Sequence, residues 1–181
     1  MNVKDLIINC IQQATLQVFS TMLGEELLVA SVATERDTQD VRDGVVSFVG
    51  LAGSWAGTGS ITCSPALACK ICAQMLMTEA SSVNEEVLDA VAEITNMIIG
   101  NVKTDLEPHL GILGLSVPTV IYGHNFKARN AGHAEWVVVR FAWGDGLLTV
   151  KLNLTPDSAK AGEKGVHAAA MLLGQPYALD V

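Results

Sequence analysis

The feature that most constrains the fold is residues 84–107, where side chains separate into two faces at the period of an α-helix. At about 100° per residue, with Asp89 set at zero, a group of polar and small residues falls within about 40° of one line. These residues are Asp89, Glu93, Asn96, Gly100 and Lys103. An apolar group lies within about 40° of the opposite line and comprises Val87, Val91, Ile94, Ile98 and Val102. The segment therefore predicts a long helix with a core-facing side and an exposed stripe.

The ends of this helix carry their own signals. Asn84 is a typical N-cap, and the following residues Glu85 and Glu86 would favour the positive end of the helix dipole. Pro108 follows the last periodic residues, so we expect the helix to end before it.

Two further helices are predicted. Residues 3–23 have apolar positions spaced mostly three and four apart, and Gly24 is suited to end the helix. Ser64 and Pro65 form a standard helix start, and the helix they open would run to about Met77.

The rest of the pattern predicts strands. Residues 148–154 alternate between apolar and polar side chains, which is typical of a half-buried strand. Other strands are expected at 45–51, 58–63, 117–122 and 136–143, whereas 27–34 fits a helix or a strand equally well. Turns are expected at 43–44, in the glycine-rich segment 52–57 and at 144–146. Helices packed on one face of a mainly antiparallel sheet would satisfy this pattern, so the fold class is α/β.

The length and the net charge of the chain limit its domain number and its possible partners. The chain has 181 residues, enough for one domain, which we expect over residues 1–154, with a C-terminal tail at 155–181 that has room for a short helix at 166–173. The net charge of −8 disfavours nucleic acid and an anionic membrane surface as partners. A secretory signal is not apparent, and no apolar run approaches the roughly 18 residues of a spanning helix. A cytoplasmic protein is the expectation.

The four cysteines are expected to be reduced thiols. Cys63, Cys69 and Cys72 resemble a metal or redox spacing, but Cys69 and Cys72 lie on an apolar helix, and no second cysteine pair follows them. Buried thiols that act as small hydrophobic groups are the favoured interpretation. The histidines show no paired ligand spacing, so no metal site is predicted.

The stripe has a chemical interpretation and a simpler one. Gly100 costs its helix about 1 kcal/mol relative to alanine, and it lies one turn after Asn96 on the same side. The missing side chain would let another surface approach the Asn96 amide. A solvated helix face would also explain these residues, and periodicity alone favours that interpretation.

The segment from Asp89 to Lys103 resembles the signature helix of the CheX and CheC chemotaxis phosphatases, which carry a Glu-x-x-Asn motif that is usually followed by Met and a nearby Gly. Here the motif is Glu93 and Asn96. The resemblance continues through Pro118-Thr119-Val120, where the family's helix gives way to a strand. The helix at 3–23 lacks a second motif, so the chain resembles CheX more than CheC. Ala92 stands where many members have Gly, and residues after 155 lie outside the resemblance.

The resemblance implies a two-layer α/β sandwich, with long helices on a largely antiparallel sheet, that hydrolyses the aspartyl phosphate of a CheY-like response regulator. A carboxamide can hold the attacking water, so Asn96 is assigned that role. Glu93 would pair with a lysine of the regulator, and Asp89, Gly100 and Lys103 would contact the partner. The protein would need no cofactor of its own, because the Mg²⁺ belongs to the regulator. A homodimer built through the sheets is also implied. The alternative is a non-catalytic scaffold or sink that captures a regulator through the same helix.

Overall fold

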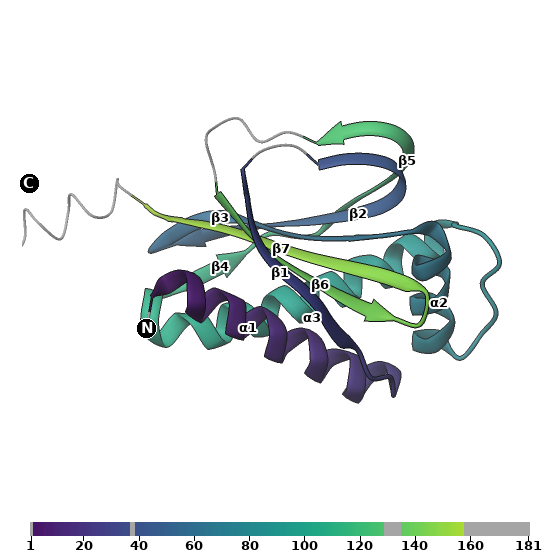
Figure 1. Ribbon diagram of the computed structural model, residues 1–181, viewed down its shortest axis with the longest axis horizontal. Coiled ribbons are helices and arrows are strands. Elements are labelled where there is room, and N and C mark those ends of the chain that lie inside the picture. Colours follow the sequence, from purple (N-terminus) through teal and green to yellow (C-terminus); the bar gives the residue numbers. More distant parts are fainter. Residues whose placement is uncertain (1, 37–38, 129–134, 158–181) are drawn as a thin grey trace, which may run out of the picture.

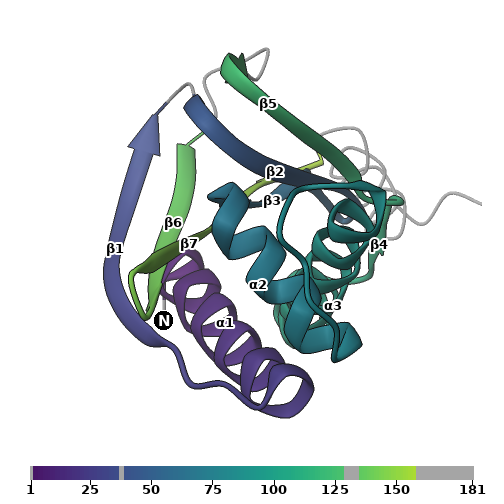
Figure 2. The ribbon, with the colours of Figure 1, turned by 90° about the vertical axis from the view of Figure 1, so that its right-hand side faces the viewer.

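The computed structural model describes residues 2–36, 39–128 and 135–157. The expected tail therefore falls mostly outside the described residues, and so does the short helix predicted at 166–173. The described part forms two layers, with helices on one side of a single sheet. Figure 2 shows the sheet curving over the helices from β1 to β5. The predicted α/β class with a largely antiparallel sheet is confirmed.

The three predicted helices are confirmed, and their ends are held by the expected caps. They are α1 (Val3–Val18), which continues into the π-helical turn η1 (Phe19–Leu23), α2 (Pro65–Leu76) and α3 (Glu85–Leu110). The Ser64 hydroxyl accepts a hydrogen bond from Leu67 N at 3.2 Å, and Asn84 Oδ1 accepts one from Val87 N at 3.0 Å. Gly24 ends η1 with a φ of 65°, a backbone conformation that glycine adopts without steric cost.

The prediction that α3 ends before Pro108 is wrong, because the helix continues to Leu110. A proline removes its own N–H from the hydrogen-bond ladder and crowds the carbonyl four residues before it, but in the last turn little helix remains to be disrupted. The backbone N–H of Gly111 donates to the Glu107 carbonyl at 3.0 Å, so the turn closes around the proline.

All strand pairings in the described residues are antiparallel. The strands are β1 (Leu28–Arg36), β2 (Gln39–Gly53), β3 (Trp55–Cys63), β4 (Leu113–Leu115), β5 (Thr119–Ala128), β6 (Glu135–Trp143) and β7 (Gly146–Pro156). The order is β1-β6-β7-β3-β2-β4, and β5 also pairs with β2.

The structure settles one open prediction and corrects another. The segment at 27–34, which fitted a helix or a strand, forms β1. The turn expected at Asp43 and Gly44 does not form, because both residues lie inside β2, paired with His124 and Gly123 of β5. Pairing along the whole length of β2 outweighs the local turn preference of these residues.

The core lies between the helices and the sheet, and α3 is its central element. The five apolar residues predicted to face the core, from Val87 to Val102, are all fully buried. Gly59 of β3 allows α3 to pack close to the sheet, since a β-carbon at Gly59 would lie 2.8 Å from Ile99 Cδ1 of α3. Because α3 is fixed against the sheet in this way, its opposite side faces solvent.

The segment Val3–Leu23 is long and apolar enough to cross a membrane, judged by length and composition alone. Ile11 and Phe19 in this segment are fully buried in the core. A core helix of this kind meets the same criterion.

Candidate functional site

The stripe predicted from the sequence lies on the outer side of α3. Asp89, Glu93 and Asn96 are exposed, and Gly100 and Lys103 are half-buried. Glu93 and Asn96 are three residues apart on one helix, so their side chains are neighbours on its surface. The structure thus places a carboxylate and a carboxamide side by side, where both can reach a molecule docked from outside.

Gly100 borders on open space. A β-carbon at this position would have one close neighbour, Leu115 Cδ1 of β4, at an ordinary contact distance of 3.8 Å. Packing among residues 2–36, 39–128 and 135–157 therefore does not require glycine here, although glycine weakens a helix by about 1 kcal/mol. The contrast with Gly59, where a β-carbon would collide with Ile99, makes the open position of Gly100 clear.

Lys103, at the end of the stripe, has a partner within the chain. Its Nζ lies 2.9 Å from Glu107 Oε1, and the same oxygen accepts a hydrogen bond from Leu113 N at 3.0 Å. The hydrogen bond from Lys103, followed by that from Leu113, lowers the pKa of Glu107. These contacts tie β4 to α3, and the partner contact expected of Lys103 stays a prediction.

The segment after β4 contains a feature that the sequence did not predict. Leu115 pairs with Leu51 of β2, and Thr119 pairs with Phe48 of the same strand. The chain therefore advances four residues from Leu115 to Thr119, while β2 advances three residues over the same distance. The extra residue makes a β-bulge, a device that redirects side chains and is common beside active sites. Val117 lies in this bulge with 85% of its surface exposed.

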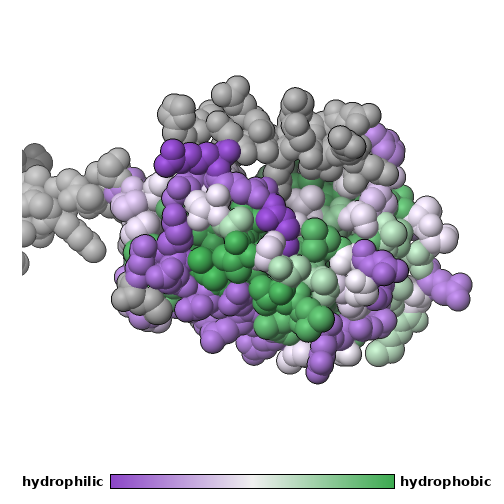
Figure 3. Space-filling model, in the orientation of Figure 1, coloured by the Kyte–Doolittle hydropathy of each residue, from purple (hydrophilic) through white to green (hydrophobic). Residues whose placement is uncertain are grey.

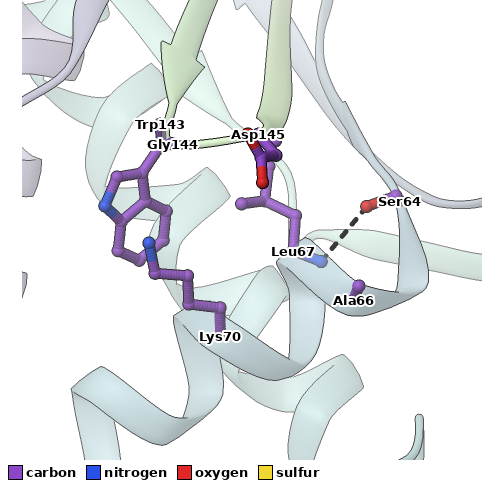
Figure 4. Close-up of a pocket in the computed structure, with 8 residues that line it drawn as sticks. Ser64, Ala66, Leu67, Lys70, Trp143, Gly144 and Asp145 are labelled. Atoms are coloured by element: carbon purple, nitrogen blue, oxygen red, sulfur yellow. Dashed lines mark hydrogen bonds between the residues drawn. The ribbon is translucent and has the colours of Figure 1, made fainter.

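A separate surface pocket of about 400 Å³ lies at the start of α2 and the turn between β6 and β7. Figure 4 shows Lys70 lying over the ring of Trp143, and its Nζ is 3.6 Å from the ring centroid. The indole N–H donates to Glu25 Oε2 at 2.8 Å. This pocket shares no lining residue with the stripe, and a cation held over an indole is adequately explained as a packing contact.

The cysteines are buried and free, as predicted. Burial raises the pKa of the Cys63 thiol to about 12, and burial is also the main cause of the raised pKa of Cys69 and Cys72. Thiols of this kind are poor nucleophiles and poor metal ligands. Within residues 2–36, 39–128 and 135–157, no group of three His, Cys, Asp or Glu side chains could hold a metal ion.

These observations define a class of protein: an α/β sandwich that carries a polar stripe on an open helix surface. The sequence pattern of the chemotaxis phosphatase CheX family matches residues 45–142, more than half of the chain. The chain belongs to this family.

Solved structures agree with this assignment. A CheC-like superfamily protein from Shewanella sp. PV-4 is 26% identical with a TM-score of 0.74, over 86% of this chain and 99% of that one. The chemotaxis protein CheX from Desulfovibrio desulfuricans is 25% identical with a TM-score of 0.74, over 82% and 99%. The CheX–CheY–BeF3–Mg²⁺ complex from Borrelia burgdorferi gives 28% identity and a TM-score of 0.63, over 82% and 97%. Among curated protein sequences, none matches this chain.

Proposed function

We propose that this protein hydrolyses the aspartyl phosphate of a CheY-like response regulator, using Asn96 and Glu93. The observation that carries the proposal is the exposure of both side chains, next to each other on the outer side of α3. A phosphatase that acted on a small molecule would gain from a closed pocket, whereas side chains on an open helix suit insertion into a partner's site. The family match and the complex of a related CheX with CheY support the same activity.

The chemistry requires little from this chain. An acyl phosphate is already activated, and hydrolysis needs a water held in line behind phosphorus. The Asn96 amide can donate a hydrogen bond to the water through its NH₂ group or accept one through its carbonyl oxygen. The water oxygen bonds to phosphorus, the bond from phosphorus to the aspartate oxygen breaks, and the products are inorganic phosphate and a free carboxylate. The Mg²⁺ that neutralises the phosphoryl charge belongs to the regulator.

Glu93 is assigned to docking. A carboxylate would repel a free phosphate anion but would attract a lysine beside the regulator's phosphorylated aspartate. Asp89, exposed on the same stripe one turn before Glu93, extends the negative surface toward the start of α3. The net charge of −8 is consistent with a protein that recognises a cationic side chain and leaves the phosphoryl group to the regulator.

Gly100 completes the site by leaving space. Since nothing in the described part of the chain prevents a side chain there, the glycine is best explained by the approach of the regulator to Asn96. Lys103 is assigned to the rim of the same contact, where its pairing with Glu107 also holds β4 in place.

The sheet offers a surface for a second copy of the chain. β1 stands at one end of the strand order, and among the described strands it pairs with β6 alone, so one of its edges has no strand partner there. It carries three exposed large apolar residues, Leu28, Val29 and Val32, of which Leu28 is 74% exposed. Figure 3 shows hydrophobic residues gathered in the middle of the face that β1 crosses. A free strand edge with apolar side chains can pair with another strand, so we propose a homodimer through this edge, in the cytoplasm with the regulator.

The decisive experiment follows the decay of a phosphorylated receiver domain with and without the protein. At a protein-to-regulator ratio well below one, an enzyme accelerates the loss of phosphoryl groups from the whole pool. A scaffold or sink, the alternative function, leaves the decay unchanged or slows it. Receiver domains from the same organism should be screened individually, because only a true partner will respond.

A further inference from the structure

We propose that Val117, in the bulge between β4 and β5, is an apolar anchor for the response regulator beside the Asn96 stripe. This inference rests on the proposed function, and it assigns to the docking surface a second part that is contributed by the sheet. The occupant is apolar surface of the regulator adjoining its phosphorylated aspartate.

The contacts of β4 give the direction of the segment. Leu113 N donates a hydrogen bond to Glu107, and Leu115 is the neighbour that a β-carbon at Gly100 would meet, so β4 runs beside α3 from its C-terminal end toward Asn96. The chain keeps this direction after β4, because Thr119 pairs with the same strand, β2, that pairs with Leu115.

The position of Val117 along α3 follows from the geometry of the two elements. Two residues of extended chain advance about 6.6 Å, and four residues of α-helix advance about 6 Å. Val117 is two residues beyond Leu115, and Asn96 is four residues before Gly100. The bulge shortens this advance, so Val117 lies beyond Leu115 in the direction of Asn96 along the helix.

The bulge holds Val117 in a defined conformation. Ser116 N donates to the Gly50 carbonyl at 2.9 Å, and Gly50 N donates to Ser116 Oγ at 2.8 Å. The Ser116 hydroxyl in turn donates to the Val117 carbonyl at 3.0 Å. An apolar side chain that is 85% exposed yet fixed by its backbone is pre-organised for contact, because little conformational freedom remains to be lost on binding.

The regulator is a better occupant than a second copy of the chain. The edge strand proposed for the homodimer is β1, which stands at the opposite end of the strand order from β4. Leu115, half-buried beside Gly100, makes the surface continuous from Val117 to the stripe. A partner that inserts its active site at Asn96 would cover this surface in the same step.

The test measures the affinity of Val117→Ala and Val117→Asp for a Mg²⁺-loaded receiver domain activated with beryllofluoride. We expect Val117→Ala to weaken binding about five- to tenfold, because up to two buried methyl groups are lost, and Val117→Asp to weaken it more. In Val117→Ala and Val117→Asp, the KM for the phosphorylated receiver should rise with little change in kcat. Val117→Ile should keep the affinity and the KM of wild type. Leu147→Asp is the matched control, because Leu147 is an exposed apolar residue at the start of β7.

The outcomes separate this inference from the proposed function. If the wild-type protein accelerates phosphoryl loss but Val117→Asp binds and turns over like wild type, the anchor is wrong and the phosphatase assignment stands. Equal loss of affinity in Val117→Asp and Leu147→Asp would also overturn the anchor. If the wild-type protein binds the activated receiver but does not accelerate phosphoryl loss, the proposed hydrolysis fails, and the affinity ratio still tests Val117.

Discussion

Gly100 of α3 and Leu115 of β4 are neighbours across an opening that would accept a side chain, since a β-carbon at position 100 would lie 3.8 Å from Leu115 Cδ1. The helix is thus weaker than it needs to be at a point one turn from Asn96. Binding sites commonly retain such local weaknesses, because function and stability make different demands on the same residue. This relationship allows the two demands to be measured separately.

Gly100→Ala should stabilise the fold and impair docking. The alanine fits the space, so the free energy of unfolding should rise by about 0.5–1 kcal/mol in a denaturant titration. The added methyl group would stand where the regulator approaches Asn96, so affinity for the activated receiver should fall. A variant with higher stability and undiminished affinity would show that the glycine does not serve the partner.

Glu93→Ala should weaken binding of the regulator as well as turnover, because the carboxylate is assigned to pair with the regulator's lysine. Glu93→Gln should behave similarly, since it keeps the shape of the side chain and removes its charge. Asp105→Ala is the matched control, because it removes another exposed carboxylate of α3. Unchanged affinity of both Glu93 variants, measured by titration calorimetry, would contradict the docking role.

The Glu107 contacts should stabilise the protein only above acidic pH. The pKa of Glu107 is lowered in the folded protein, chiefly by the hydrogen bond from Lys103. Its stabilising effect is therefore complete above the pKa of the unfolded chain and is lost as the pH falls through the lower, folded-state pKa. Wild type should be more stable than Glu107→Gln at pH 7, and the difference in unfolding free energy should shrink below about pH 4. A difference that stayed constant with pH would exclude this origin.

The cysteines should be inert in the folded protein. With a pKa of about 12, the Cys63 thiol is ionised in about one molecule in 10⁴ at pH 8, and all four thiols are buried. An alkylating reagent should label the native protein very slowly and all four cysteines of the denatured protein quickly. Rapid labelling of Cys69 or Cys72 in the native protein would instead support a reactive pair.

Much of the α3 site was predictable because its information is local. The 3.6-residue period places Glu93 and Asn96 opposite a set of apolar residues, and burial of that set fixes the direction of the stripe. The helix starts at Ser64 and Asn84 were also predictable, since each side chain caps its own helix.

Features that depend on distant pairing were not predictable in the same way. Asp43 and Gly44 have strong turn preferences, yet pairing with β5 keeps them in a strand. β4 is only three residues long, too short for an alternating pattern, and it forms because β2 and Glu107 offer partners. The exposure of Val117 follows from an extra residue relative to β2, which a single sequence does not reveal.

The most direct test of the account compares Asn96→Ala with wild type on the same phosphorylated receiver. The receiver is supplied at concentrations that saturate the wild-type protein and the variant. Removal of one positioned polar group typically lowers a rate by about 10²–10³, so accelerated phosphoryl loss should fall by that factor. Affinity for the beryllofluoride-activated receiver should remain within a fewfold of wild type, because Glu93 is intact. Full acceleration of phosphoryl loss by Asn96→Ala would contradict the central claim that this carboxamide positions the attacking water.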